Sequence, residues 1–198
     1  MRFLSPDPVG LAEAASILSR GGLVLYPTES FYGAAALALH EGAVDRLREL
    51  KGRPADMPLP LILPNIQSLE LVVEAVPRAA QELIERYWPG PLTIVLFAKE
   101  GLPSAIIGSR GVGVRLSPHP VATGLALEVG APITATSANR AGEPPPRDAV
   151  SASLALPGAD AVLDGGEVQG GLPSTVLAVA QDGGLTLLRQ GAADVGLA

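Results

Sequence analysis

The chain has 198 residues, and its 14 Lys and Arg against 20 Asp and Glu leave a formal net charge of −6. The absence of Cys excludes disulfides and thiolate metal sites, and the presence of only 2 His excludes a multi-histidine metal centre. With 47% hydrophobic and 17% charged residues, the composition excludes a disordered chain and predicts one domain over residues 1–198. The acidic balance argues against a protein that coats nucleic acid, but it allows a small anion to bind a few placed cations.

Membrane and targeting segments are not evident in the sequence. No apolar run reaches the roughly 18 residues that a membrane span needs, and the N-terminus lacks a basic segment followed by an apolar stretch. The sequence therefore predicts a cytoplasmic protein that does not contact a membrane.

Apolar periodicity and turn residues predict alternating helices and strands along the first half of the chain. Asp7-Pro8 predicts the start of the first helix, because an N-cap residue precedes proline at the first helical position, and Gly21-Gly22 ends it. Asn65 predicts the cap of another helix, whose apolar residues recur at helical spacing as far as Val76. The other predicted elements of this half are strands over 23–26 and 59–63, helices over 41–50 and 80–87, and a polar loop over 28–33.

The second half of the chain continues the alternation. The predicted elements are strands over 92–98, 112–116, 133–136, 161–163, 175–179 and 185–189, and helices over 120–129 and 147–154. Residues 165–171 form a glycine-rich connector, which we expect to be a loop over a site. Because the elements alternate without a repeat, the predicted fold class is α/β or α+β, with a mixed sheet in three layers.

Polar stretches follow several predicted strands and helices, where sites of α/β folds gather. Thr28 and Ser30 flank the carboxylate of Glu29, so the loop has the groups to hold a small polar ligand. A capped turn whose hydroxyls satisfy backbone N–H groups is the simpler explanation of this loop alone. Lys51 and Arg53 could bind phosphate, and equally they could end a helix whose dipole favours cations.

Two further stretches lie within or just after predicted strands. Arg115 interrupts the apolar strand predicted over 112–116, which follows Gly111, and burial requires a partner, either a ligand carboxylate or a structural Asp or Glu. Ser137 and Asn139 end another strand, among small residues that allow close backbone approach to a nucleotide. No Ser-His-Asp set and no Walker-type phosphate loop is present, so the residues by themselves predict a domain that binds a small anion or a nucleotide.

The motifs recur in a specific order along residues 10–191: Pro27-Thr28-Glu29, Tyr32-Gly33, Lys51-Gly52-Arg53-Pro54, Trp88-Pro89-Gly90-Pro91-Leu92-Thr93, Val114-Arg115, His119-Pro120, Ser137-Ala138-Asn139 and Ser174-Thr175-Val176. In this order they resemble the YrdC-like L-threonylcarbamoyladenylate synthases of the short, single-domain type. The resemblance implies helices flanking a twisted, mostly seven-stranded mixed sheet around a deep cavity. It also implies an enzyme, a nucleotidyltransferase that makes threonylcarbamoyl-AMP and pyrophosphate from L-threonine, bicarbonate and ATP for tRNA N6-threonylcarbamoyladenosine modification.

The resemblance also implies which residues hold each substrate. The implied L-threonine-binding residues are Thr28, Ser30, Tyr32, Arg115, Ala135 and Ser174. The implied ATP-binding residues are Lys51, Arg53, Gly111, Ser137, Asn139, Pro145 and Arg189. Lys51 and Arg53 are the implied catalytic residues. Mg²⁺ is expected to arrive with ATP and not in a protein site, and tRNA or the threonylcarbamoyl-transferase complex is a candidate partner.

The sequence departs from the family pattern at residues 34–39, at Met57 and at Ile62. Two other functions stay open at this point. The first is a carbamoyl-adenylate-forming domain like that of hydrogenase-maturation proteins, against which the absence of zinc-finger cysteines argues. The second is a non-catalytic RNA-binding or ribosome-maturation module, against which the negative charge argues.

Overall fold

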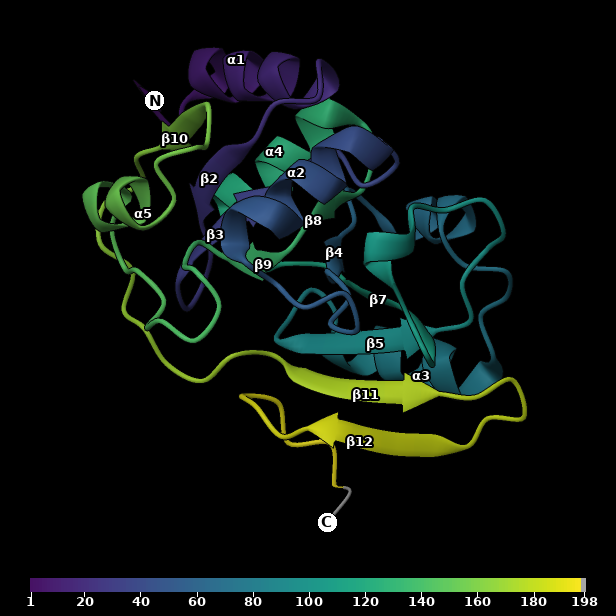
Figure 1. The fold of residues 1–198 in the computed structure, drawn as a ribbon. Helices are drawn as coiled ribbons and strands as arrows, with labels where there is room; N and C mark the ends of the chain where they lie inside the picture. The colour runs from purple at the N-terminus through teal and green to yellow at the C-terminus, as the bar shows by residue number, and fades with distance from the viewer. Residues whose placement is uncertain (197–198) are drawn as a thin grey trace.

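A computed structural model describes residues 1–196 as alternating helices and strands (Figure 1). The helices of this part are α1 (Pro8–Ser19), α2 (Glu41–Lys51), α3 (Arg78–Tyr87), α4 (Pro120–Val129), α5 (Ala149–Ala155) and the 3₁₀ helices η1 (Ile66–Leu71) and η2 (Ser104–Ile106). The strands are β1 (Arg2–Leu4), β2 (Val24–Pro27), β3 (Tyr32–Ala35), β4 (Leu61–Ile62), β5 (Leu92–Leu96), β6 (Ile107–Gly108), β7 (Gly111–Arg115), β8 (Ile133–Thr134), β9 (Thr136–Ser137), β10 (Ala161–Leu163), β11 (Thr175–Val179) and β12 (Leu185–Arg189). The predicted domain boundary at residue 198 lies outside the described residues.

The strands pair into two mixed sheets. A five-stranded sheet has the order β1-β10-β2-β3-β9, in which β1, β10 and β2 are parallel and β3 is antiparallel to both of its neighbours. A seven-stranded sheet has the order β12-β11-β5-β7-β4-β8, with β6 paired to β7. The predicted α/β class with a seven-stranded mixed sheet is confirmed, and the five-stranded sheet is an addition that the strand pattern did not predict.

The segment from β8 to β9 joins the two sheets. β8 pairs with β4 in the seven-stranded sheet, and after Ala135 the chain enters β9, which pairs with β3 in the five-stranded sheet. The Thr134 hydroxyl donates to the Ala34 carbonyl and accepts from the Ala36 N–H, both at 2.9 Å. These bonds fasten β8 to β3, so the ends of strands from both sheets converge around this crossing.

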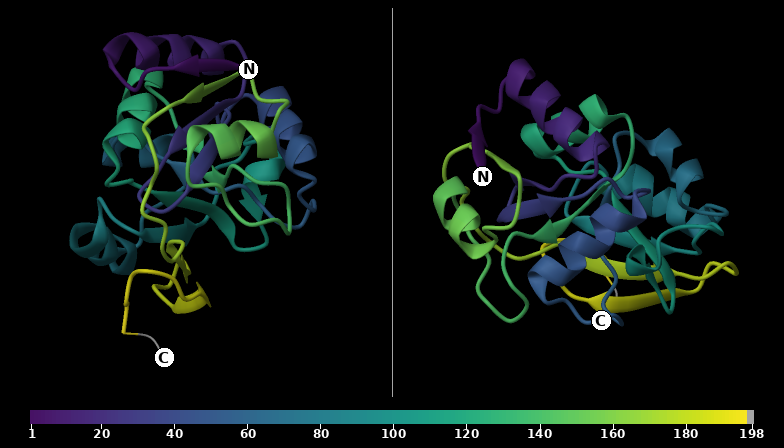
Figure 2. Two further views of the ribbon diagram at one scale, coloured as in Figure 1. Left: turned by 90° about the vertical axis from the view of Figure 1, so that its left-hand side faces the viewer. Right: turned by 45° about the horizontal axis from the view of Figure 1, so that its top comes forward.

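The helices cover the sheets through two apolar clusters. α1 and α4 pack against each other and against β2, and their buried Leu18 and Leu125 belong to the smaller cluster (Figures 1 and 2). The larger cluster joins Leu47 of α2 and Ile84 of α3 to strands of both sheets. α1 begins as predicted, since the Asp7 carboxylate accepts the Gly10 N–H at 2.9 Å. None of the helices in residues 1–196 has the length and apolar character needed to cross a bilayer.

The helix predicted after Asn65 begins as expected, but its type and its second half are wrong. Asn65 caps it as expected, accepting the Ser68 N–H, but the helix is a 3₁₀ helix that ends at Leu71. Beyond that point the chain pairs with residues 97–99, where the Lys99 N–H donates to the Val72 carbonyl at 3.0 Å. The helical spacing therefore identified buried residues correctly, while tertiary pairing overrode the helix.

Candidate active site

A cavity of about 160 Å³ lies at the junction of the two sheets. Its wall comes from the loop between β2 and β3, the β8–β9 segment, β5, the end of β7, and the facing ends of β11 and β12. All the predicted L-threonine-binding residues line it: Thr28, Ser30, Tyr32, Arg115, Ala135 and Ser174. Three predicted ATP-binding residues line it as well: Arg53, Ser137 and Arg189.

A second pocket of about 550 Å³ adjoins the first and shares Arg53, Thr93 and Arg189 with it. Gly111, another predicted ATP-binding residue, lines this pocket at the start of β7. Its φ is +115°, and a Cβ there would lie 1.9 Å from the Leu96 carbonyl oxygen, so no other residue fits. A small polar chamber and a larger, arginine-lined pocket therefore share part of their walls.

The loop after β2 is shaped by short-range hydrogen bonds. β2 ends at Pro27, and the Thr28 hydroxyl donates to the Phe31 carbonyl at 2.6 Å, closing the turn into β3. On β3, Gly33 lies over the Tyr26 ring, where a Cβ would approach ring atoms to 3.0 Å. The Thr28 hydroxyl also accepts the Ser30 and Phe31 N–H groups, both at 3.4 Å, so the capped-turn explanation holds for Thr28. The same turn presents Ser30 to the cavity.

Tyr32 links the cavity to the glycine-rich connector. Its hydroxyl donates to the Gly166 carbonyl at 2.8 Å and accepts the Gly165 N–H at 3.1 Å. The connector continues into Pro173 and Ser174, which line the cavity. As predicted, the connector is therefore a loop beside the site.

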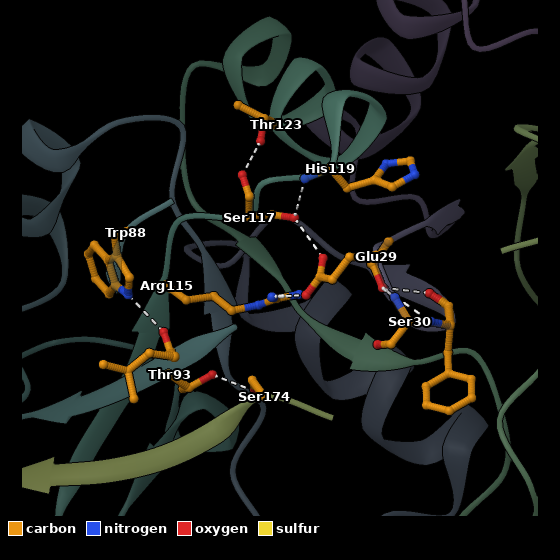
Figure 3. A network of polar contacts seen from close by, with 12 residues as sticks. Glu29, Ser30, Trp88, Thr93, Arg115, Ser117, His119, Thr123 and Ser174 are labelled. Carbon is orange, nitrogen blue, oxygen red and sulfur yellow. Dashed lines mark hydrogen bonds and ion pairs between the residues drawn. The ribbon is translucent and has the colours of Figure 1, made fainter. Parts of the chain in front are cut away.

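Arg115 is ion-paired inside the cavity. Its Nη1 contacts Oε1 of Glu29, and the Ser117 hydroxyl donates to Glu29 Oε2 at 3.1 Å (Figure 3). Burial would raise the pKa of Glu29, but the charge and hydrogen bond of Arg115, with help from Ser117, hold that pKa below its usual value. Of the two partners that the sequence left open for Arg115, a structural carboxylate is present, and the guanidinium lines the cavity at the same time.

Arg53 and Arg189 differ from Arg115 in their hydrogen-bond partners. Arg53 donates to the Met57 and Pro58 carbonyls at 2.9 and 3.0 Å, and Arg189 donates to the Ser174 carbonyl, at 2.7 Å from Nη2. Burial lowers the pKa of both guanidinium groups, and the neighbouring cation lowers it further in each case. Within residues 1–196 neither forms an ion pair with a carboxylate, so their charge is left for an anionic ligand.

Lys51 and Asn139 lie behind the cavity wall. The buried Lys51 ammonium donates to the carbonyls of Ser137 and Asn139, the latter at 2.6 Å, and burial followed by repulsion from Arg53 lowers its pKa to about 8. The Asn139 amide donates to the Glu143 carbonyl at 2.6 Å, while its buried Oδ1 has no partner among the described residues. Neither residue lines the two pockets, nor does the half-buried Pro145, so direct contact of the three with ATP stays a prediction.

The sequence analysis gave no binding role to Thr93 or Ser117, and it considered Glu29 only as part of the polar loop. Thr93 faces the cavity from β5 and its hydroxyl lies 2.8 Å from that of Ser174. Glu29 carried a detectable signal, because it is an acid between two hydroxyl residues at a strand end. Ser117 carried none, since its contact with Glu29 spans 88 positions of the sequence.

Protein metal ligands do not gather at this site. In the part of the chain that the structure describes, no group of three or more His, Asp or Glu side chains could hold a metal ion. The donors that face the two pockets are instead guanidinium, hydroxyl and backbone groups, which suit an anion.

This fold and site define an α/β domain with a small polar cavity beside a larger, arginine-lined pocket. The chain belongs to the Sua5/YciO/YrdC family, whose model, described as telomere recombination, matches residues 16–191. A relative named threonylcarbamoyl-AMP synthase, from Pyrococcus abyssi (strain GE5 / Orsay), is 42% identical over 166 residues, which are 83% of this chain and 49% of that relative. Another of the same name, from Xanthomonas campestris pv. campestris (strain B100), is 37% identical over 81% of this chain and 88% of its own length.

The fold also matches a solved structure with a bound ligand. The crystal structure of P. abyssi Sua5 complexed with L-threonine superimposes with a TM-score of 0.88 at 36% identity, over 96% of this chain and 57% of that one. The chain thus spans about half the length of the first curated relatives that it matches, 49% and 53% in two cases.

Proposed function

We propose that this chain is an L-threonylcarbamoyladenylate synthase, which makes threonylcarbamoyl-AMP and pyrophosphate from L-threonine, bicarbonate and ATP. The observation that carries the proposal is the cavity in which all the predicted L-threonine-binding residues meet Arg53 and Arg189. Relatives named threonylcarbamoyl-AMP synthase and the L-threonine complex of P. abyssi Sua5 support it.

The reaction needs no covalent nucleophile from the chain. The nitrogen of L-threonine bonds to the carbon of bicarbonate, one water leaves and one proton passes to solvent, which gives a carbamate. A carbamate oxygen then attacks the α-phosphorus of ATP, and the bond from that phosphorus to the bridging oxygen breaks as pyrophosphate leaves. Catalysis is mainly positioning of the two substrates and stabilisation of the phosphate charge by cations.

The two pockets suit the two substrates. The small chamber, with its hydroxyls and the Arg115–Glu29 pair, fits an amino acid, and the larger pocket has room for the nucleotide. Arg53 and Arg189 line both, so their guanidinium groups lie where phosphates would meet the amino acid. In this arrangement Lys51 supports the Ser137 loop from behind and adds positive charge.

Mg²⁺ belongs to this proposal as part of the ATP substrate, where it neutralises phosphate charge. The hydroxyl and arginine groups of the pockets would hold the phosphates and not the ion. Delivery of the product to a transferase complex for tRNA modification, and a cytoplasmic location, stay predictions from the sequence.

The test is pyrophosphate release by the purified chain with ATP, Mg²⁺ and bicarbonate, with and without L-threonine. The proposal predicts release only when L-threonine and bicarbonate are both present, together with an adduct of the mass of threonylcarbamoyl-AMP. Release without L-threonine, or none, would contradict it. Turnover with carbamoyl phosphate in place of L-threonine and bicarbonate would indicate a carbamoyl-adenylate-forming domain, and salt-sensitive tRNA binding without turnover would indicate an RNA-binding module.

A further inference from the structure

The small cavity has one acidic group in an otherwise cationic and hydroxyl-rich wall. Among the described residues that line it, Glu29 is the single acid, whereas Arg53, Arg115 and Arg189 are cations. A ligand with one positive and one negative end would therefore find a single complementary position for its positive end.

The Glu29 carboxylate is held in place by fixed partners. Arg115 engages Oε1, and the Ser117 hydroxyl donates to Oε2 at 3.1 Å (Figure 3). The same Ser117 oxygen accepts the His119 N–H at 3.1 Å, which directs the hydroxyl hydrogen to Glu29. The Ser117 carbonyl in turn accepts the Thr123 hydroxyl at 2.7 Å, which ties Ser117 to the first turn of α4.

Glu29 keeps capacity for a further partner. A carboxylate has about four acceptor positions, of which the Arg115 and Ser117 contacts use two. Its side chain is 26% exposed, compared with 9% for Arg115, and it lines the cavity. Because its pKa lies below the usual value, the group is ionised at neutral pH.

Arg115 also keeps capacity on its ligand side. A guanidinium group has five N–H donors, and in residues 1–196 the Arg115 side chain donates only to Glu29, through Nη1. The pair can therefore bind both ends of a zwitterion at once, the carboxylate at Arg115 and the ammonium at Glu29.

We propose that Glu29 binds the ammonium group of L-threonine and thereby makes the site select a free amino acid over the corresponding hydroxy acid. This inference rests on the proposed function. It also implies how the carbamate is oriented in the cavity. After the nitrogen has bonded to the carboxyl group, its one remaining N–H can donate to Glu29. The new carbamate charge is repelled by Glu29 and attracted to Arg53 and Arg189, where the phosphates would lie.

The test compares L-threonine with (R)-3-hydroxybutanoate, which lacks only the amine, by calorimetric titration without ATP. The unaltered chain should bind L-threonine at least about tenfold more tightly than the hydroxy acid, the usual size of one charge-assisted hydrogen bond. Glu29→Gln should weaken L-threonine binding at least about tenfold and should not weaken binding of the hydroxy acid. The preference for the amine should thus be lost.

A purely structural role for Glu29, acting through Arg115, predicts that Glu29→Gln weakens both ligands equally, and that result would overturn the inference. Retention of the full preference by the variant would also overturn it. Failure of the unaltered chain to bind L-threonine at all would instead refute the proposed function, and the inference with it.

The matched control is Glu128→Gln, the same change at an exposed residue of α4 outside the cavity, which should alter neither affinity. Thermal unfolding of each variant checks that it folds. If Glu29→Gln does not fold, Glu29→Asp keeps the charge and should keep the preference for L-threonine over the hydroxy acid; loss of that preference would overturn the inference.

Discussion

The two ends of the cavity hold their cations in opposite ways. At one end Arg115 is ion-paired with Glu29, and a hydroxyl supports the pair. At the other end Arg53 and Arg189 donate to carbonyl and hydroxyl oxygens, and across residues 1–196 no carboxylate pairs with either. The first end is electrically neutral before a ligand arrives, whereas the second carries charge that only an anion neutralises.

Because of this difference, we expect the paired residues to affect mainly stability and the unpaired cations to affect mainly ligand binding. Removal of one partner of a buried ion pair destabilises the fold, because the other partner is left as an uncompensated charge. An unpaired cation contributes little to folding, and it gives its interaction energy to a ligand that supplies the missing charge. Substitutions at the two ends should therefore have different effects on unfolding and on affinity.

The largest expected effect is on stability at the paired end. Arg115→Met leaves Glu29 charged and partly buried without its partner, and should lower the free energy of unfolding by about 3 kcal/mol. Arg53→Met, at the other end, removes only hydrogen bonds to two carbonyls and should cost about 1 kcal/mol or less. Urea unfolding without ligands measures both.

A double-mutant cycle isolates the pair. Arg115→Met combined with Glu29→Gln should be more stable than Arg115→Met alone, because the second change removes the stranded charge. Equal losses for Arg115→Met and Arg53→Met, or strictly additive changes in the cycle, would mean that the two ends do not differ as the contacts indicate.

For binding of an ATP analogue, we expect the larger effect at the cationic end. Arg53→Met should weaken binding of a non-hydrolysable ATP analogue at least about tenfold, the value of one charge-assisted contact to phosphate. L-Threonine affinity should stay nearly unchanged, since Arg53 lies at the cationic end. Arg78→Met is the matched control, because Arg78 is exposed and its ion pair is with Glu82 on the same helix. If Arg53→Met weakened binding of both the ATP analogue and L-threonine, the result would contradict the proposed difference between the two ends.

Much of the fold could be predicted from local sequence. α4 and β10 have their predicted bounds, because Pro120 and Gly130 mark the helix ends and a short apolar run marks the strand. β1 and β3 were not predicted. In β1 only Leu4 is buried, and β3 reads Tyr-Gly-Ala-Ala, whose small residues are explained by packing against β2 and not by strand propensity.

The site was less accessible to sequence reasoning. Residue types and their positions after predicted strands and helices singled out several residues of the cavity, but only the family resemblance implied which substrate each would hold. The two partners considered for Arg115 could not be distinguished by spacing. Its contact with Glu29 joins positions 86 apart, which come together only because β2 and β7 belong to sheets that meet at this point. The position of Lys51 behind the wall depends on the same tertiary arrangement.

The buried Lys51 should make the stability of the chain depend on pH. Its pKa is about 8 in the folded chain and near its usual 10.5 when unfolded, so the unfolded state binds the proton more tightly between these values. Keeping the buried cation charged therefore costs stability below pH 8, and the cost is relieved as pH rises toward 10.5. The unaltered chain should gain stability over Lys51→Met by at most about 1.4 kcal/mol per pH unit in this window. Urea unfolding of both proteins from pH 8 to 10 measures the difference, and a flat difference would contradict the assignment.

The smallest expected effect is the stability lost when one hydroxyl is removed at either end of the cavity. Ser117→Ala removes a hydrogen bond to the Glu29 carboxylate and should cost about 1 kcal/mol at pH 7. The pKa of Glu29 is lowered in the folded chain, so the stability that its ionised form contributes is present above its usual value of 4.5 and is lost as pH falls through the lowered value. The cost of Ser117→Ala should therefore shrink over the same acid range.

Ser174→Ala gives the contrast at the cationic end. The Ser174 hydroxyl contacts Thr93 and Arg189, neither of which titrates in acid, so its cost should stay constant as pH falls. Unfolding free energies of the two variants at pH 7 and at acid pH values provide the measurement. If the costs of Ser117→Ala and Ser174→Ala followed the same pH dependence, the hydroxyl at the paired end would not be acting through the Glu29 carboxylate, and the neutral end would owe its order to Arg115 alone.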